Sequence, residues 1–401
     1  MATVADRPTP IAADAEPPAG SGGDQPCEVT IVAHDIGPVG GMERQLHELV
    51  LGLRRMGHPV TVIGWRCELP QGSGVVFHRV AGPRRPFLLG YPLFMLLGSL
   101  AVRRWRRGVV QSTGALVLNH VDVVAIHCCH QVYRGMPKRS TAPLRAYARL
   151  MAAIKRFAER MCVRWSGASA FVCVSDGVAE EMRRYYPRAA KRVTTIHNGV
   201  DTDVFAPAAH EREASALRAS IGVAEQRLLA AFVGGSWEHK GLACVIEALP
   251  KTPGWDLLVA GDGDQQRYQQ LARDLGVADA VHWLGVVREA QVVYALADAF
   301  VLPSRYETFS LVTFEAAASG LPVLATPVSG VRELIVDGES GFLIARDGAA
   351  IAERLNTLAA DPALRKRLGE AARQAALPFS WEEMVAKHHQ LYTRLATGSS
   401  T

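Results

Sequence analysis

The sequence predicts an α/β protein made of two successive doubly wound units, each a parallel sheet covered by helices. Two observations lead to this prediction: short β-rich runs alternate with helical segments, and the alternation restarts after Asp201. The chain has 401 residues, of which 49% are hydrophobic and 21% charged. That length is long for one domain and sufficient for two globular domains.

Composition and rhythm divide the chain into four parts. Residues 1–26 are rich in Ala, Pro and Gly, so we expect a disordered tail; they lack the basic start and apolar core of a secretory signal. Residues 27–205 form the first predicted domain and residues 206–376 the second. Residues 377–401 are expected to form a C-terminal helix that packs back on the first domain.

The first domain opens with a β-rich run, residues 28–34, which a glycine loop follows at residues 37–41. Apolar residues at helical spacing come next and stop at Gly57, and residues 60–64 read as another strand. This strand–loop–helix–strand order implies a parallel sheet. Further strands are expected at residues 121–126 and 170–174, with a helix that includes residues 154–165 between them.

The second domain repeats the pattern. Four buried strands are expected at residues 228–233, 257–260, 281–284 and 299–302, with helical segments between them. The last helix opens with Ser380 followed by Glu383, which is the spacing of a capping box.

Charge indicates one possible partner. The net charge is 44 − 39 = +5, too mild to predict a nucleic-acid partner. Residues 86–102 are almost uncharged and apolar, and four arginines and a tryptophan follow at residues 103–107. The apolar run is shorter than the ~20 residues of a spanning helix, and Pro92 and two glycines interrupt it, so no transmembrane helix is predicted. Residues 86–107 are either a surface that docks on an anionic inner leaflet or a buried helix with a solvated basic end.

The cysteines indicate the compartment. There are seven, an odd number, without paired metal-type spacing. Buried reduced thiols in a cytoplasmic protein are the simplest interpretation.

Residues 301–343 hold the constellation with the clearest chemistry. A buried strand ends at Pro303, and a polar turn leads into a helix that Gly320 ends. Thr308 or Ser310 can cap this helix, and free backbone N–H groups around Phe309, Ser310 and Leu311 would then suit a diphosphate.

Two glutamates flank the start of this helix. Glu307 precedes it and Glu315 lies about two turns inside it. Ligands of open α/β sheets bind at the carboxyl ends of strands, so both carboxylates can face one cleft and accept hydrogen bonds from sugar hydroxyls. From spacing alone, Glu307 could equally be a capping charge and Glu315 a solvated helix residue.

This stretch resembles the E-x7-E signature of the family 4 glycosyltransferases, which have the GT-B fold. The resemblance covers nearly all of residues 28–395 and includes several other segments. These are residues 37–44 (GPVGGMER), 171–182 (FVCVSDGVAEEM), 196–201 (IHNGVD), 234–241 (GGSWEHKG) and 260–263 (AGDG). The first domain is most similar to that of the bacterial lipopolysaccharide-core glucosyltransferases.

The resemblance implies two Rossmann-like domains that face each other across a cleft. It further implies a retaining transfer from a UDP- or GDP-sugar, bound by the second domain, to a hydroxyl of a glycan, lipid-linked or small-molecule acceptor. No metal and no other cofactor are expected. Two D-x-D stretches, Asp201 to Asp203 and Asp262 to Asp264, lie inside segments that the resemblance explains.

The resemblance also assigns roles to residues. Glu307 would contact the transferred sugar, Glu315 the nucleotide ribose, and Lys240 the donor diphosphate, whose charge it would neutralise as the bond breaks. Many members carry an arginine where this chain has Gly235, and Arg305 is one candidate to replace that charge.

The first domain contributes the other predicted site residues. His127 ends a predicted strand and would approach the donor sugar near the reacting carbon, with Asp122 and His130 as competitors for this role. Gly40 and Gly41 would let the backbone approach the cleft closely.

Other functions fit less well. A glycoside hydrolase needs a second catalytic carboxylate across the bond, which the sequence does not identify. An oxidoreductase would need a G-x-G-x-x-G turn with its downstream acid. A GT-B-fold nucleotide-sugar epimerase and a non-catalytic nucleotide-sugar-binding module stay open as alternatives.

Overall fold

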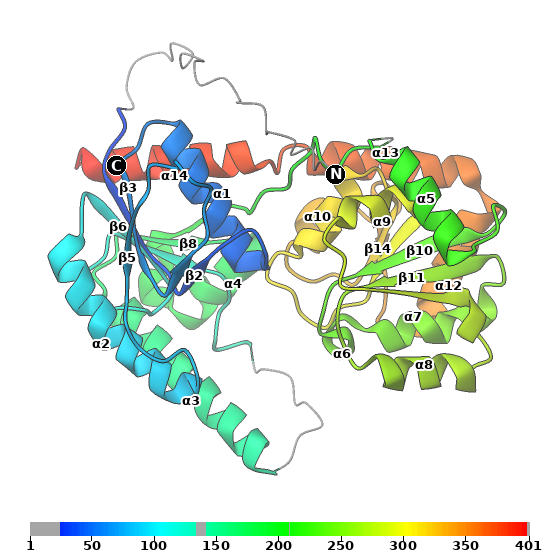
Figure 1. Cartoon of the computed structure of the whole chain (residues 1–401), viewed down its shortest axis with the longest axis horizontal. Helices are drawn as coiled ribbons and strands as arrows, with labels where there is room; N and C mark the ends of the chain where they lie inside the picture. Colours follow the sequence, from blue (N-terminus) through cyan, green and yellow to red (C-terminus); the bar gives the residue numbers. More distant parts are fainter. Residues whose placement is uncertain (1–24, 134–141, 208, 399–401) are drawn as a thin grey trace, which may run out of the picture.

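The computed structural model describes residues 25–133, 142–207 and 209–398 and consists of two α/β domains side by side (Figure 1). The predicted disordered tail lies almost entirely outside the described residues. The predicted fold class, two Rossmann-like doubly wound units, is confirmed by two separate parallel sheets of seven and six strands.

The first sheet has the order β5-β3-β1-β6-β7-β8-β9, and every neighbouring pair in it is parallel. Its strands are β1 (Val29–Val32), β3 (Val60–Gly64), β5 (Val76–Arg79), β6 (Val109–Thr113), β7 (Val123–Ile126), β8 (Ala170–Cys173) and β9 (Val193–Thr195). Every residue of β1, β3, β6, β7 and β8 is buried, as expected for parallel strands with helices on both faces. A separate two-stranded ribbon pairs β2 (Asp35–Ile36) with β4 (Arg66–Cys67).

Three strands of this sheet were not predicted. β5 is an edge strand without an apolar run, β9 has only three residues, and three of the five residues of β6 (VVQST) are polar although the strand is fully buried. Periodicity gives little signal for such short or polar strands.

Helices α1 (Gly41–Arg55), α2 (Phe87–Trp105), α3 (Ala142–Trp165) and α4 (Asp176–Tyr185) cover this sheet, and a 3-10 turn, η1, spans Pro187–Arg192. α2 corrects one expectation, because Pro92 does not interrupt the apolar run but lies inside a single helix of 19 residues. Of the helices described, α2 is the one whose length and apolar content would suffice to cross a membrane, and 39% of its apolar window is buried within the protein.

The second sheet has the order β12-β11-β10-β13-β14-β15 and is also parallel throughout. Its strands are β10 (Leu228–Val233), β11 (Trp255–Ala260), β12 (Val281–Gly285), β13 (Ala299–Leu302), β14 (Val323–Ala325) and β15 (Gly341–Leu343). The first four match the predicted strands closely; β14 and β15 have three residues each and were not separately predicted.

The second domain has nine α-helices among the described residues. They are α5 (Glu211–Ile221), α6 (Trp237–Lys240), α7 (Leu242–Ala248), α8 (Gln265–Asp274), α9 (Ala290–Leu296), α10 (Leu311–Ala318), α11 (Val331–Leu334), α12 (Gly348–Ala360) and α13 (Pro362–Ala376). Short 3-10 turns, η2 (Leu249–Lys251) and η3 (Ala278–Ala280), precede β11 and β12.

The chain then returns to the first domain as α14 (Trp381–Ala396), drawn in red in Figure 1. Ser380 accepts a hydrogen bond from the Glu383 N–H at 3.1 Å, so the predicted helix start is correct. α14 packs on α1 at Gly52, where a Cβ atom would collide with Val385. The two domains are therefore connected twice, once by the segment that leads from the first domain to the second and once by the segment that leads back to α14.

Candidate active site

Each sheet has one switch point, where the strand order proceeds in opposite directions on the two sides. It lies between β1 and β6 in the first sheet and between β10 and β13 in the second. The carboxyl ends of parallel strands form a crevice at such a switch point, where doubly wound proteins bind ligands. In the second domain, the short helix α6 after β10 carries Lys240, and the loop after β13 carries Glu307. In the first domain, the glycine loop lies at this point and His127 follows the nearby strand β7.

Lys240 and Glu307, which are 67 residues apart in the chain, form an ion pair in the structure. The Lys240 Nζ donates to Oε1 of Glu307 at 2.9 Å, and the Ser304 hydroxyl donates to the same oxygen at 2.8 Å. Each side chain of the pair is 15% exposed. A cation and a carboxylate are therefore held together at the carboxyl edge of the sheet, partly shielded from water.

Strained backbone marks both loops around this pair. Ser236 (φ 56°) and Ser310 (φ 70°) are the non-glycine residues with positive φ in the described parts of the chain. Such a conformation costs on the order of 1–3 kcal/mol and is commonly retained at functional sites.

The start of α10 differs from the prediction in one respect. Ser310 occupies the N-cap position, but its hydroxyl bonds to the Thr313 hydroxyl at 2.7 Å and caps no backbone N–H. Within the described residues, the N–H groups of Phe309, Ser310 and Leu311 donate to no other group. Because the Phe309 ring is buried and stacks on Phe314 with centroids 4.1 Å apart, only its backbone can serve a ligand.

Glu315 is buried, which excludes the interpretation as a solvated helix residue. Its Oε1 accepts from Nη1 of Arg44 at 2.8 Å, and Oε2 accepts from the Tyr294 hydroxyl at 3.3 Å. Burial raises the pKa of Glu315 above its usual value, although the charge of Arg44 opposes this shift. Arg44 belongs to the first domain and was not predicted as a site residue, although it ends the glycine-loop match.

The predicted glycines lie where α1 and α10 approach each other. Gly40 has φ 99°, a conformation that favours glycine. A Cβ atom on Gly41 would lie 3.8 Å from a methyl group of Leu311. The backbone of the first domain therefore comes within van der Waals reach of the start of α10.

His127 follows β7, at the carboxyl edge of the first sheet. Its Nε2 lies 3.2 Å from Oε1 of Gln45, and its Nδ1 is buried without a partner within the described residues. Burial, with a smaller effect of His388, lowers the pKa of His127 to about 4, so the imidazole is neutral at neutral pH.

The two competitors of His127 lie in different places. Asp122 precedes β7, at the opposite edge of the sheet, and accepts from the Val110 N–H at 2.8 Å. His130 lies near His127, with its Nδ1 3.5 Å from the Cys128 sulfur.

Neither Gly235 nor Arg305 supplies a charge in contact with the Lys240–Glu307 pair, and the Arg305 side chain is exposed. Arg346, which was not predicted, instead braces both loops. Its guanidinium donates to the carbonyl oxygens of Pro303 at 2.9 Å and Glu238 at 2.8 Å. No sequence pattern around Arg346 predicts this role.

The D-x-D stretches have local structural uses. Asp201 accepts from the Val204 N–H at 2.9 Å, and Asp264 caps α8 by accepting from the Arg267 N–H at 3.3 Å. Asp201 thus stabilises a turn and Asp264 the start of a helix.

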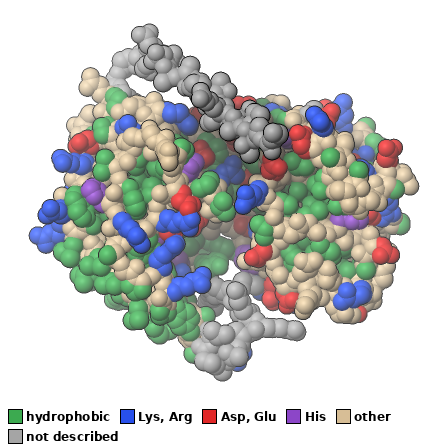
Figure 2. Space-filling view, in the orientation of Figure 1, with side chains coloured by type: hydrophobic (Ala, Val, Ile, Leu, Met, Phe, Trp, Pro, Cys, Tyr) green, Lys and Arg blue, Asp and Glu red, His purple; other side chains and the backbone are tan. Residues whose placement is uncertain are grey.

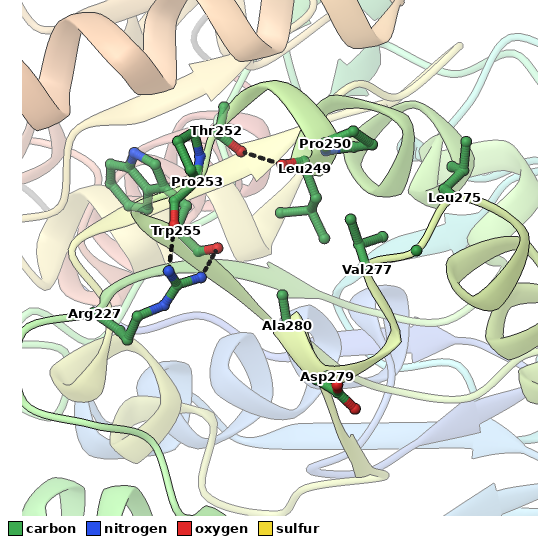
Figure 3. Close-up of a pocket in the computed structure, with 11 residues that line it drawn as sticks. Arg227, Leu249, Pro250, Thr252, Pro253, Trp255, Leu275, Val277, Asp279 and Ala280 are labelled. Atoms are coloured by element: carbon green, nitrogen blue, oxygen red, sulfur yellow. Dashed lines mark hydrogen bonds between the residues drawn. The ribbon is translucent and has the colours of Figure 1, made fainter.

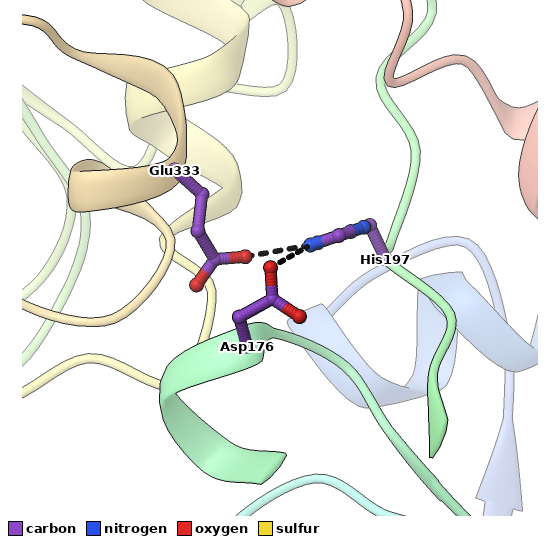
Figure 4. A group of neighbouring side chains, drawn as sticks. All are labelled: Asp176, His197 and Glu333. Atoms are coloured by element: carbon purple, nitrogen blue, oxygen red, sulfur yellow. Dashed lines mark ion pairs between the residues drawn. The ribbon is translucent and has the colours of Figure 1, made fainter. Parts of the chain in front are cut away.

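A cluster that no sequence spacing revealed lies between the domains (Figure 4). Nε2 of His197 lies 2.7 Å from Glu333 and 3.7 Å from Asp176, and the ligand atoms of all three lie within 4.8 Å of one another. Burial opposes ionisation of Glu333, but hydrogen bonds from His197 and from backbone N–H groups outweigh it and lower the pKa of Glu333. The cluster brings side chains of the two domains into contact, and its spacing could also hold a cation.

A pocket of about 410 Å³ lies elsewhere in the second domain. Figure 3 shows the residues that line it. Arg227 and Trp255 line it at the starts of β10 and β11. It is therefore at the amino edge of the sheet, opposite the Lys240–Glu307 pair.

Comparison with known proteins agrees with this arrangement. A family model described as Glycosyltransferase Family 4 matches residues 39–204, and one described as Glycosyl transferases group 1 matches residues 213–375. The chain belongs to glycosyltransferase family 4. Among curated relatives of this family member, glycogen synthase of Mycobacterium tuberculosis (strain CDC 1551 / Oshkosh) is 29% identical, with 90% of this chain and 92% of the relative covered. Alpha-maltose-1-phosphate synthase of Mycolicibacterium smegmatis is 31% identical, with 61% and 67% covered.

Solved structures show that this family 4 chain has the GT-B fold. WaaG, a glycosyltransferase involved in lipopolysaccharide biosynthesis, superposes with a TM-score of 0.74 at 22% identity, covering 92% of this chain and all of WaaG. Anabaena Alr3699/HepE in complex with UDP-glucose superposes with a TM-score of 0.71 at 19% identity, covering 93% and 100%.

Proposed function

We propose that this glycosyltransferase transfers a hexose, with retention of configuration, from a nucleotide-diphosphate sugar to a hydroxyl group of its acceptor. The observation that carries the proposal is the Lys240–Glu307 pair next to the unpartnered N–H groups at the start of α10. An ammonium and oriented amides stabilise the charge that a departing diphosphate acquires. Glu307 is then within reach of the sugar hydroxyls and Glu315 of the ribose.

The first domain favours retention. The residue of this domain that is predicted to approach the reacting carbon is His127, a neutral imidazole and not a carboxylate base. The acceptor oxygen would bond to the anomeric carbon on the face from which the diphosphate leaves. The bond between that carbon and the diphosphate oxygen breaks, its electron pair stays on the diphosphate, and the diphosphate takes the acceptor proton.

UDP- or GDP-sugars are the proposed donors, and the complex of HepE with UDP-glucose supports the uridine form. Incubation with a panel of both kinds of donor, with release of nucleoside diphosphate as the readout, tests the proposal. A transferase releases the diphosphate in an acceptor-dependent way. An epimerase would interconvert donors without an acceptor, and a binding module would do neither.

Activity is expected to be independent of metal, because Lys240 and the start of α10 are assigned the role of the cation. Turnover should survive EDTA and show no stimulation by Mn²⁺ or Mg²⁺. The variant His197→Gln serves as the control, since it removes the one imidazole of the interdomain cluster. Loss of activity in EDTA that Mn²⁺ restores in the wild type, but not in this variant, would overturn the expectation and assign the metal to that cluster.

The protein is proposed to act in the cytoplasm and to dock on the inner leaflet through α2. Three leucines of this helix, Leu89, Leu96 and Leu100, are 54–63% exposed and recur at intervals of seven and four residues, which places them on one face. The exposed side chains of Arg103, Arg104, Arg106 and Arg107 follow at its end.

α3 adds to this surface. It exposes Leu150, Phe157 and Trp165, and six of its residues are basic against one acidic. Figure 2 shows hydrophobic side chains gathered over α2 and α3 with Lys and Arg nearby. Exposed leucines beside arginines suit an anionic bilayer surface.

Sedimentation with anionic liposomes should show binding at low salt that decreases as salt rises, because each arginine contributes about 1 kcal/mol that ions screen. Replacing Arg103, Arg104, Arg106 and Arg107 by Gln should abolish most of this binding. Removing the same amount of charge from the second domain, at the exposed Lys251, Arg288, Lys366 and Arg367, should leave it unchanged. Wild-type protein that stays in the supernatant at low salt would contradict the membrane proposal.

A further inference from the structure

A second cavity, of about 260 Å³, lies in the first domain at its own switch point. The ends of β1, β6 and β7 form one side of it, and α2 and α3 form the walls. His127, which is predicted to approach the donor sugar, lines it. A crevice at this position of a doubly wound sheet is where a second substrate is expected.

The walls of this cavity are mainly apolar. Phe87 and Tyr91 of α2 stack with centroids 5.3 Å apart, and the His34 ring meets Tyr91 edge-on at 6.0 Å. Leu116 and Val163 also line the cavity. A site for a free glycan would instead present many groups to bond its hydroxyls.

The polar groups of the walls are largely occupied. The Tyr91 hydroxyl donates to the Ala115 carbonyl at 2.6 Å. The Glu159 carboxylate accepts from the His130 N–H at 2.8 Å and from the Tyr186 hydroxyl at 2.7 Å. These groups have little bonding capacity left for a ligand.

Three polar atoms at the strand ends are different. Nε2 of His34, Oγ1 of Thr113 and Nδ1 of His127 are buried and have no hydrogen-bond partner within the described residues. They follow or end β1, β6 and β7, and all three residues line the cavity. Buried polar atoms without a partner are uncommon in proteins, so a ligand that bonds them is a physical explanation for all three.

The cavity has one cationic side chain, Lys155, which lies next to the aromatic rings of α2. The Lys155 ammonium lies 5.3 Å from the centroid of the Phe87 ring. In the described part of the chain, no carboxylate lies within ion-pair distance of it. The Glu159 carboxylate also lines the cavity, but its oxygens are bonded to the His130 N–H and the Tyr186 hydroxyl, so the Lys155 ammonium is the charge left to pair with an anion. This arrangement suits an apolar group that carries an anion.

We propose that this cavity binds an acceptor in which an aliphatic chain is joined through a phosphate to the group that carries the reacting hydroxyl. The chain lies between α2 and α3, the phosphate lies at Lys155, and the hydroxyl points toward His127. The exposed apolar faces of the same two helices would let the chain enter from a lipid surface. The assignment as an acceptor rests on the proposed function; the binding chemistry rests on the cavity alone.

Geranyl phosphate, geraniol and inorganic phosphate are the probes, with binding to the full chain measured by calorimetry. We expect geranyl phosphate to bind at least roughly tenfold more tightly than either of the others, since a contact with a charged group is worth about that factor. Lys155→Met should reduce its affinity to that of geraniol, whereas Lys191→Met, at an exposed lysine of the same domain, should not.

Filling the cavity provides the second arm. Ala115→Leu and Cys162→Phe, both at partly exposed cavity residues, should each abolish binding of geranyl phosphate while thermal unfolding shows the variants folded. Equal binding by these variants and the wild type, or by the Lys155→Met and Lys191→Met proteins, would overturn the inference.

Turnover and binding of a nucleotide-sugar, measured on the same samples, separate the two proposals. If a nucleotide-sugar is turned over but geranyl phosphate does not bind, the inference fails and the transferase stands. If geranyl phosphate binds as described and no nucleotide-sugar does, the cavity stands and the transferase fails.

Discussion

Replacing Lys240 by methionine is expected to lower kcat/KM by about 10²–10³, the loss seen when one preorganised group that stabilises transition-state charge is removed. The methionine keeps most of the side-chain volume but cannot donate to Glu307 or to a diphosphate. The N–H groups at the start of α10 remain, so some activity should persist. Initial rates of nucleoside diphosphate release, with acceptor saturating, measure the effect.

Two controls make this test specific. Lys251→Met, at an exposed lysine of the same domain, should leave kcat/KM unchanged. Glu307→Gln should also lower kcat/KM, because an amide bonds sugar hydroxyls more weakly than a carboxylate does. If the Lys240→Met protein is folded and has wild-type kcat/KM, the ion pair is structural and the donor lies elsewhere.

Replacing Glu315 by glutamine is expected to weaken nucleotide binding by about tenfold to a hundredfold, since each hydrogen bond to a charged group contributes roughly 1.5–3 kcal/mol. Glutamine retains the shape of the side chain and an oxygen that can accept from Arg44. The fold should therefore persist. Calorimetry with UDP and GDP measures the affinity.

Glu315→Ala separates binding from stability. Because Glu315 is buried, alanine would leave the Arg44 guanidinium and the Tyr294 hydroxyl without their partner, and the melting temperature should fall as well. Arg44→Met, which removes the other member of the pair, should lower the melting temperature but leave the ribose contact in place. Unchanged nucleotide affinity in the Glu315→Gln protein would remove Glu315 from the site.

Local patterns determined the fold class and half of the candidate site. The run from residue 301 to residue 330 contains a buried strand, a polar turn and a helix in sequence. This local order made Glu307 and Glu315 candidates, and the family resemblance favoured their place in the site over purely structural roles. β10 and β11 were predicted because a strand that is buried on both faces appears in the sequence as an apolar run. All but the first residue of β10 and every residue of β11 are buried. β6 was not predicted because its apolar run is only two residues long and polar residues follow it, although every residue of the strand is buried.

Only the tertiary structure decided what each side chain touches. Arg44 meets Glu315 across 271 residues, and His197 draws together Asp176 and Glu333 from two domains. No periodicity records these contacts, because they depend on how two sheets are placed relative to each other. The same holds for α2, whose composition is apolar throughout. The sequence by itself left open whether this helix lies in the core or on a surface, and the packing of the first domain decided that Tyr91 and Phe94 are buried while Leu96 and Leu100 remain exposed, since only one face of a helix can pack against its sheet.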